Sequence, residues 1–268
     1  MAVLSMKQIS VSTWNVNSIR SRLTHLVTFL NEYAPDVVLL QETKCQDFQF
    51  PRADIEECGY NIAMKCQPTF NGVAILSKTP IEDVWSDLVE EEGRKEEARY
   101  IEGFTTIDNI NLRVASVYVP QGTEIDSPRF QFKLSFYELL KKRFQIHMDN
   151  DELLIAGGDY NVAPEAHDVY DPKALEGSLG FHMEERKRFR AILNSGMKDT
   201  FRLVHPSTQE YTWWDYRTAG WKRNHGMRLD HILASSSAAD HVTEVFVCKK
   251  YRALEKPSDH APVVCRLS

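Results

Sequence analysis

The chain has 268 residues, of which 43% are hydrophobic, 26% charged and 10% aromatic. This composition is typical of a globular protein and excludes disordered, collagen-like and coiled-coil chains. The 32 Lys and Arg residues against 38 Asp and Glu residues give a net charge of −6. By itself this charge disfavours a nucleic-acid-binding protein, because such proteins usually carry basic surfaces.

Targeting signals and the cysteine pattern indicate the cellular compartment in which the protein is expected to work. No run of about 18 apolar residues predicts a membrane span, and polar residues interrupt the start of the chain, so a signal peptide is not expected. The five cysteines include no CxxC pair. This pattern favours reduced thiols, no zinc site and a cytoplasmic location.

Short apolar or alternating runs rich in β-branched residues predict strands along the whole chain. In chain order they cover residues 9–14, 37–40, 60–64, 72–76, 100–107, 112–119, 153–156, 211–214, 228–233, 242–247 and 261–267. The dipeptides Asn71-Gly72 and Asp108-Asn109 predict hairpin turns. The acidic stretch 90–97 predicts a solvated surface loop.

Three helices are expected between these strands. The first covers residues 21–33 and is ended by Pro35. The second begins after the N-cap Ser127 with Pro128 in its first turn, and the third covers residues 183–194. Many strands with interleaved helices predict an α/β fold of two packed mixed β-sheets flanked by helices. We expect one domain over residues 1–268, with residues 1–7 as a short N-terminal extension.

Acids and amides, together with one histidine, recur just after, within or just before the predicted strands, where α/β proteins usually build their sites. These residues are Asn15, Asn17, Glu42, Asp159, Asn161, Asp230, Asp259 and His260. Carboxylates gathered at one edge would repel one another unless a cation neutralised them, and oxygen ligands without thiolates select Mg²⁺ or Mn²⁺. Such a site suits the hydrolysis of a phosphodiester or phosphomonoester.

Each of these residues taken alone has an ordinary structural explanation. Glu42 could be a helix cap or a surface acid, and Asn15 or Asn161 could be a turn residue. Tyr118 could be a half-buried strand tyrosine, and His231 could be a packing residue within its strand. Their joint placement at strand ends favours the catalytic interpretation.

Six ordered motifs resemble one known family. They are WNVNS at residues 14–18, LQETK at 40–44, YVPQG at 118–122, GDYN at 158–161, LDHIL at 229–233 and SDHAP at 258–262. Together they resemble the exodeoxyribonuclease III family of abasic-site endonucleases, within the endonuclease/exonuclease/phosphatase superfamily. The resemblance implies a four-layer α/β sandwich with the site at one edge of the two sheets.

The resemblance also implies a role for each residue. Glu42 would be the principal Mg²⁺ carboxylate, and Asn15, Asp159, Asn161, Asp259 and His260 would lie in the metal region. Asp159 would orient or deprotonate the attacking water, or protonate the leaving oxygen. Asn161 would position water and phosphate, while His260, oriented by Asp230, and the Tyr118 hydroxyl would contact the phosphate.

Local charge favours DNA as the substrate in spite of the acidic total. Residues 216–229 contain no acid but include Arg217, Arg223 and Arg228, and they follow the aromatic cluster 211–214. Basic and aromatic residues together suit a phosphate backbone beside an exposed sugar or base. The resemblance assigns Trp213 to the pocket for the abasic sugar; Trp214 could lie there or in the core. We also expect Asn17 and Lys44 to contact DNA, whereas the basic residues at 141–143 and 186–190 could belong to solvated helix faces.

The expected activity is Mg²⁺-dependent incision of double-stranded DNA at abasic sites, with 3′→5′ exonuclease and 3′-phosphodiesterase activity. Substrates would be duplexes with abasic sites or blocked 3′ ends, and the protein would act as a monomer without an obligate protein partner. Two alternatives stay open. His167 could fill the sugar pocket and favour a specialised 3′→5′ exonuclease, or the enzyme could hydrolyse a phosphate that is not part of a nucleic acid.

Overall fold

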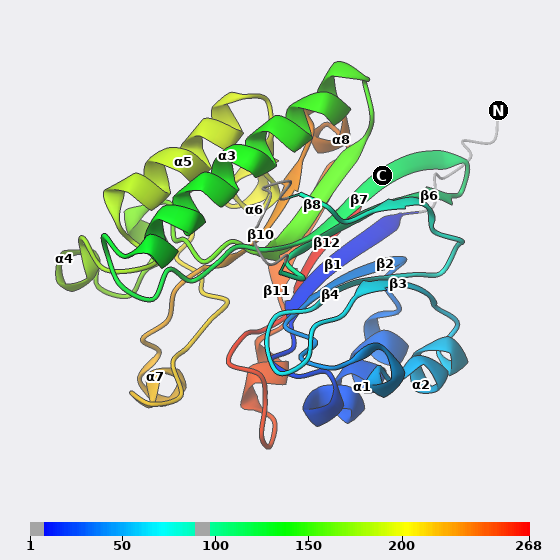
Figure 1. Cartoon of the computed structure of the whole chain (residues 1–268), viewed down its shortest axis with the longest axis horizontal. Coiled ribbons are helices and arrows are strands. Elements are labelled where there is room, and N and C mark those ends of the chain that lie inside the picture. The colour runs from blue at the N-terminus through cyan, green and yellow to red at the C-terminus, as the bar shows by residue number, and fades with distance from the viewer. Residues whose placement is uncertain (1–7, 89–96) are drawn as a thin grey trace.

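A computed structural model describes residues 8–88 and 97–268. They form four layers, in which two β-sheets pack face to face and helices cover both outer faces (Figure 1). The expected fold of two mixed sheets flanked by helices is confirmed. The one-domain prediction for residues 1–268 stays a prediction, and the extension expected at residues 1–7 lies outside the described residues.

Each sheet mixes parallel and antiparallel strands. The first has the order β11-β12-β1-β2-β4-β3, and the second has the order β5-β6-β7-β8-β10-β9. The strands of the first sheet are β11 (Val242–Val247), β12 (Val263–Leu267), β1 (Ile9–Asn15), β2 (Val37–Gln41), β4 (Val73–Ser77) and β3 (Asn61–Lys65). Those of the second are β5 (Glu82–Trp85), β6 (Tyr100–Ile107), β7 (Ile110–Tyr118), β8 (Leu154–Asp159), β10 (Asp230–Ala234) and β9 (Lys198–Asp199).

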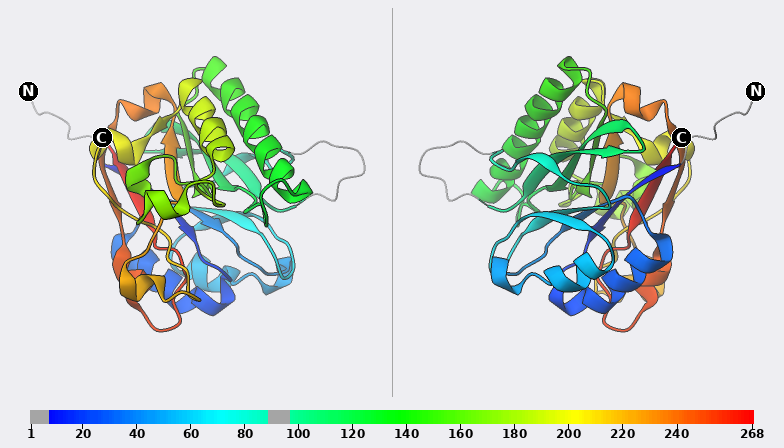
Figure 2. Two further views of the ribbon diagram at one scale, coloured as in Figure 1. Left: turned by 90° about the vertical axis from the view of Figure 1, so that its left-hand side faces the viewer. Right: turned by 90° about the vertical axis from the view of Figure 1, so that its right-hand side faces the viewer.

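Helices close the two outer faces. α1 (Leu23–Tyr33) and α2 (Arg52–Glu57) lie on the first sheet, and α3 (Pro128–Asp149) and α5 (Met183–Asn194) lie on the second, as both side views show (Figure 2). The shorter helices are α4 (Pro172–Leu175), α6 (Thr200–Val204), α7 (Gly220–Arg223) and α8 (Ser236–Ala239). Among the described residues, no helix has the length and apolar character needed to cross a membrane.

Helix capping follows the sequence signals. The Ser127 side chain accepts a hydrogen bond from the Phe130 amide at the start of α3, and Pro128 occupies the first turn. α1 ends at Ala34, whose left-handed φ of 44° lets its amide return to the Leu30 carbonyl. The three helices expected from the sequence are therefore confirmed.

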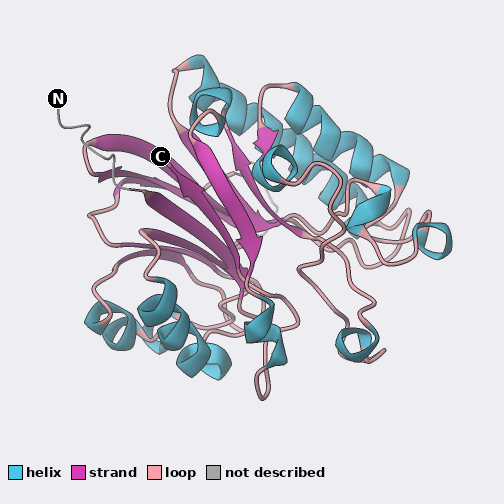
Figure 3. Ribbon diagram, turned by 180° about the vertical axis from the view of Figure 1, so that it is seen from behind, coloured by secondary structure: helices cyan, strands magenta, loops and turns pink. Residues whose placement is uncertain are grey.

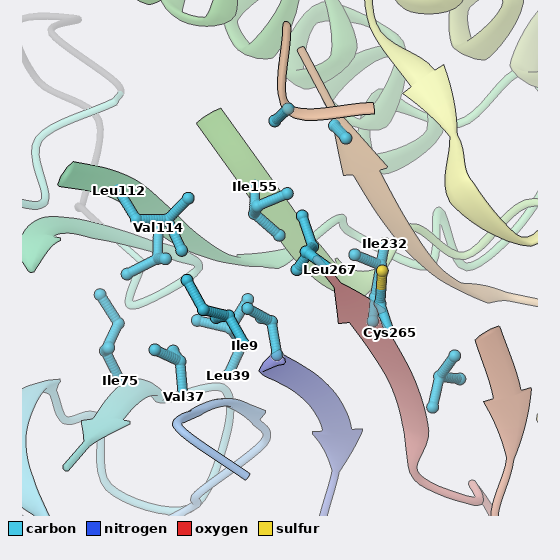
Figure 4. Close-up of a cluster of buried hydrophobic side chains, with 14 of the residues drawn as sticks. Ile9, Val37, Leu39, Ile75, Leu112, Val114, Ile155, Ile232, Cys265 and Leu267 are labelled. Atoms are coloured by element: carbon cyan, nitrogen blue, oxygen red, sulfur yellow. The ribbon is translucent and has the colours of Figure 1, made fainter. Parts of the chain in front are cut away.

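The central core lies between the sheets, where alternate strand residues interdigitate. Ile9, Val37 and Ile75 from the first sheet face Val114 and Ile155 from the second (Figure 4). Two further apolar clusters fill the spaces under α3 and α5 and under α1. Seen from behind, the strands fan across the molecule between these helical layers (Figure 3). This packing holds the strand ends, and hence the site, in a fixed arrangement.

Several local predictions need correction. Asp108-Asn109 does form the β6–β7 turn, with φ of 48° and 67°. Asn71-Gly72 instead ends a longer connection between β3 and β4. The carbonyls of both residues accept hydrogen bonds from the backbone amides of Thr43 and Lys44. Residues 211–214 form only isolated bridges at Trp213 rather than a strand. The short strands β5 and β9 were not expected. Of the acidic stretch 90–97, only Glu97 lies within the described residues.

A buried charge cluster lies under α3, on β6. The fully buried Glu102 carboxylate accepts from Tyr100 Oη at 2.5 Å, His147 Nε2 at 3.0 Å and Arg143 Nε at 3.0 Å. Although burial alone would raise the pKa of Glu102, hydrogen bonds from His147, Arg143 and Tyr100 lower it to about 2. Arg143 was expected on the surface with its neighbours, but it is half-buried and paired here.

Candidate active site

The predicted site residues meet at one edge of the two sheets. β1 and β2 run parallel, so that Asn15 at the end of β1 lies beside Glu42, the first residue after β2. β7 and β8 are also parallel and pair Tyr118 with Asp159. β10 is antiparallel to β8 and sets Asp230 opposite Asp159. Parallel strands end at the same edge, where the antiparallel neighbour begins, so residues far apart in sequence converge there.

The turns that follow these strands have left-handed backbone. Asn17, Glu42, Lys44 and Asn161 have φ of 45°, 51°, 49° and 50°. Such conformations cost non-glycine residues free energy, and they persist where surrounding contacts impose them. Here they turn the side chains inward at the strand ends.

Two carboxylates face one amide. Asn15 Nδ2 donates to Glu42 Oε1 at 2.7 Å and to Asp159 Oδ2 at 3.0 Å. Asn161 Nδ2 lies 3.3 Å from the same Asp159 oxygen, and the Asn161 amide donates to Asp159 Oδ1 at 2.9 Å. The amides of Asn15 and Asn161 thus fix the orientation of Asp159.

Asp159 carries a strongly perturbed pKa. Burial, with the negative charges of Asp230 and Glu42 working against the positive charge of His260, raises the pKa of Asp159 to about 7. A carboxyl with this pKa can exchange a proton near neutral pH. That property is required of a general acid or base.

His260 is paired with a buried acid. Its Nδ1 lies 2.8 Å from Asp230 Oδ2, and its Nε2 lies 3.7 Å from Asp159 Oδ2. Burial works to lower the pKa of His260, but the charges of Asp230 and Asp159 raise it to about 10. The imidazole is therefore positively charged at neutral pH, which suits a contact with a phosphate oxygen.

Asp259 is held by its own neighbours. Its Oδ1 accepts from Asn17 Nδ2 at 2.9 Å and its Oδ2 from Trp213 Nε1 at 3.0 Å. Burial would raise the pKa of Asp259, but the charge of His260 and the hydrogen bonds from Trp213 and Asn17 keep it below its usual value. Lys44 Nζ lies 2.6 Å from both Asn17 Oδ1 and Glu42 Oε2, which links this side of the site to Glu42.

Tyr118 lines the same cavity. Burial and the adjacent Glu42 carboxylate raise the pKa of the Tyr118 phenol, so its hydroxyl stays protonated and available as a donor. The Arg99 guanidinium lies over the ring, 4.6 Å from its centroid. This contact fixes the ring at the rim of the site.

A cavity of about 350 Å³ opens over these groups. Its polar lining residues, here called the polar wall, include Asn17, Glu42, Tyr118, Asp159, Asn161, Asp259 and His260. A second group of lining residues, here called the apolar wall, contains Leu179, Gly180, Trp213, Met227 and Leu229. An apolar wall directly beside the acids can hold a sugar or base while the polar wall acts on its phosphate.

The sequence did not reveal most of this apolar wall. Met227 pairs with Trp213 in an isolated bridge, and alternation along this extended segment puts Met227 and Leu229 on the face toward the cavity. The alternation could have been recognised in residues 227–229. Leu179 lies in an irregular loop and carries no such signal.

Arg228 was predicted to bind DNA, and the structure contradicts this. Its side chain is 1% exposed, with Nε 2.6 Å from Asp168 Oδ1 and Nη2 2.8 Å from Asp199 Oδ2. It points away from the face that carries Met227 and Leu229. Arg217 and Arg223 are exposed, and Arg217 lines the cavity.

The remaining sequence alternatives can also be placed. Trp214 is fully buried in the core, and His231 is buried with Nε2 2.8 Å from the Val162 carbonyl. His167 lies in the short 3-10 helix Ala166–Asp168 and is not among the residues that line the cavity. The basic residues 186–190 pair mainly with acids of the helix or of nearby loops.

The donor set fits a hard divalent cation. Within the described residues, Glu42, Asp159 and His260 offer ligand atoms that lie within 4.8 Å of one another. The carboxylates of Glu42 and Asp159 suit such a cation, and the His260 imidazole lies beside them. Asp230 Oδ1, buried and without a partner, adds to the negative charge that the site leaves uncompensated.

Fold and site together define a class, a hydrolase that acts on phosphate esters with acids gathered at the edge of a four-layer sandwich. Residues 12–260 match the model of the Endonuclease/Exonuclease/phosphatase family. Exodeoxyribonuclease III of Haemophilus influenzae is 31% identical over 94% of this chain and 97% of its own length.

Two solved structures are similar to this chain in fold and in sequence. The 3′–5′ exonuclease NExo of Neisseria meningitidis superposes with a TM-score of 0.90 at 35% identity, over 97% of this chain and 100% of that one. An AP endonuclease from Archaeoglobus fulgidus superposes with a TM-score of 0.89 at 38% identity, over 97% and 99%. The chain belongs to the endonuclease/exonuclease/phosphatase family, and within it the protein is a nuclease of the exodeoxyribonuclease III type. The family resemblance and enzyme class expected from the sequence are confirmed.

Proposed function

We propose that this DNA-repair nuclease hydrolyses the phosphodiester 5′ to an abasic site and also removes nucleotides or blocking groups from 3′ ends. The observation that carries the proposal is the cavity itself. Its polar wall brings Asp159, Glu42 and His260 together, and its apolar wall lines the same cavity. A sugar without its base fits such a wall, since no stacked and paired base holds it in the duplex and its carbon atoms can contact apolar side chains.

The proposed cofactor is Mg²⁺, with Mn²⁺ as a substitute. Glu42 would be its principal ligand, with Asp159, Asn161, Asn15 and Asp259 around it. When bound, the cation supplies positive charge that stabilises the phosphate in the transition state. Proton transfer and orientation are left to the side chains.

Asp159 is the proposed general base. Its raised pKa suits the carboxylate to take a proton from the attacking water, and Asn161 holds that carboxylate in place. The charged imidazole of His260 would bind a non-bridging phosphate oxygen, kept in orientation by Asp230. The Tyr118 hydroxyl would donate to the phosphate from the other side.

The proposed DNA surface surrounds the cavity. Asn17, Lys44, Trp213 and Arg217 line it, and Arg223 is exposed on α7. α7 projects from the molecule beyond these strand ends (Figure 1). We further propose that the enzyme works in the cytoplasm as a monomer.

A specialised 3′→5′ exonuclease is the second candidate, because both an AP endonuclease and a 3′–5′ exonuclease are similar to this chain. That candidate depended on His167 filling the sugar pocket. The absence of His167 from the residues that line the described cavity supports abasic-site incision instead.

The test is a gel assay with a 5′-labelled duplex that carries one internal abasic-site analogue. We expect one product, cut at the analogue with Mg²⁺ and absent with chelator. A ladder that shortens from the 3′ end without a cut at the analogue would favour the second candidate. No cleavage of any DNA would contradict both.

A further inference from the structure

An ion pair with no exposed surface lies behind the cavity. Lys133 on α3 and Glu185 on α5 are both 0% exposed, and Lys133 Nζ contacts Glu185 Oε1 directly. Taking two charges out of water costs several kcal/mol each, and an apolar pair of similar size is often as stable. Helix packing alone therefore does not account for charged residues at this position.

The lysine holds two loops by their carbonyl groups. Besides Glu185, its ammonium donates to the carbonyl of Gln121 at 3.1 Å and to that of Asn161 at 2.8 Å. An ammonium has three donor hydrogens, so these three acceptors use all of them. The bond to Asn161 helps to hold this residue in the left-handed backbone conformation, with a φ of 50°.

The glutamate holds a third loop by its amides. Glu185 Oε1 accepts from the Gly180 amide at 3.2 Å, and Oε2 accepts from the His182 amide at 3.0 Å. The Gly180 carbonyl in turn accepts from the Ala163 amide at 2.7 Å. The loop before α5 is thereby tied to the loop after β8.

All three loops form walls of the active-site cavity, where Gln121, Asn161 and Gly180 are lining residues. We propose that Lys133 and Glu185 are positioning residues that hold the polar and apolar walls in register, so that phosphate and sugar lie correctly against Asp159. The inference rests on the proposed function. In this role Lys133 and Glu185 do not themselves contact DNA.

The test removes both charges together. In Lys133→Met/Glu185→Leu the helices keep an apolar contact of similar size, but the three loops lose their anchors. We expect kcat on abasic duplex to fall by about 100-fold, the effect of misplacing reacting groups by about 1 Å. KM should change less than about threefold, because phosphate contacts outside these loops dominate DNA affinity.

Arg143→Met is the matched control. Arg143 lies on the same helix and pairs with the buried Glu102, but none of its partners lines the cavity. This variant should lose thermal stability and keep kcat. If the double variant folds and keeps kcat within about threefold of wild type at a temperature where both are folded, the inference is wrong.

Hydrogen exchange on the wild-type protein covers the case in which the double variant does not fold. The Gly180 and His182 amides lie in a loop, yet their bonds to Glu185 predict exchange as slow as that of the β8 amides. Fast exchange at both positions would overturn the proposed anchoring. Failure of the wild type to cut abasic DNA would instead count against the proposed function, so the two failures can be told apart.

Discussion

Two buried carboxyl groups in this protein have opposite environments. Glu102 under α3 is surrounded by donors, and its pKa is lowered to about 2. Asp159 at the sheet edge lies among other acids, and its pKa is raised to about 7. Both side chains are hidden from solvent, so burial alone does not distinguish them.

The two sites differ in how far neighbouring groups compensate the negative charge of the carboxylate. Glu102 has enough positive and polar partners to satisfy its charge, so it stabilises the fold. Asp159 and Glu42 share the Asn15 amide as a donor, and the site keeps negative charge in excess, which a bound cation could balance. Changes at the first site should therefore affect stability and changes at the second should affect rate.

The largest effect is expected for Asp159→Asn. Loss of the general base should lower the single-turnover rate by about 10³- to 10⁴-fold, with DNA binding retained in a gel-shift assay. Because the pKa of this carboxyl is raised from 3.8 to about 7 in the folded state, its contribution to stability is lost as pH rises from about 4 to about 7 and stays lost above that. The variant's Tm at pH 8 should then equal or exceed that of wild type. Near-normal turnover would remove Asp159 from the chemistry.

Glu102→Gln should lower the stability of the fold and leave the cleavage rate nearly unchanged. It leaves Arg143 and His147 without a buried counter-charge, and we expect the free energy of unfolding to fall by about 3 kcal/mol. Denaturant titration measures this change, with cleavage assays at low temperature as the activity readout. A large loss of kcat in the folded variant would break the contrast between the two sites.

Glu42→Ala should lower activity by about 100-fold, because a bound cation contributes several kcal/mol and each 1.36 kcal/mol is a factor of ten. Raised Mg²⁺ or Mn²⁺ should restore part of the activity, since Asp159 keeps its place near the metal region. A titration of rate against metal concentration measures both effects. An unchanged metal dependence would argue against Glu42 as the principal ligand.

Acid unfolding gives a second test of the contribution of Glu102 to stability. Its folded-state pKa of about 2 lies below its ordinary value of 4.5, so its contribution to stability is present above about pH 4.5 and lost as pH falls toward 2. Glu102→Gln should lack this part of the pH dependence. Parallel stability curves for wild type and variant between pH 5 and pH 2 would contradict the assignment.

Arg217→Ala should have the smallest effect. Because this exposed arginine lies at the cavity rim, its removal should reduce the slope of log K against log salt by about 0.9, the value for one phosphate contact. Arg228 is not a useful target for this test, because its substitution would uncouple Asp168 and Asp199 in the interior.

Strand-end acids were readily predicted because their signal is local: an apolar run followed by Glu42 or by Asp159 and Asn161. The pairing of β1 with β2 and of β7 with β8 then brings them together. The fold class followed in the same way from alternation and helix caps.

Contacts between distant segments were harder to predict. Arg228 looked like part of a basic strip, since the sequence does not show that Asp168 and Asp199 meet it in the interior. Nothing in the sequence near Lys133 or Glu185 predicts that these two residues are buried together. Their burial depends on how α3 and α5 pack against the loops, which no short segment specifies.

The most direct test of the account measures single-turnover cleavage of an abasic duplex by Asp159→Asn and Glu102→Gln, each at a temperature where it is folded. We predict a rate loss of about 10³-fold or more for Asp159→Asn and a rate close to wild type for Glu102→Gln. Similar rate losses in both variants would contradict the claim that uncompensated charge at the sheet edge, rather than buried charge in general, produces the activity.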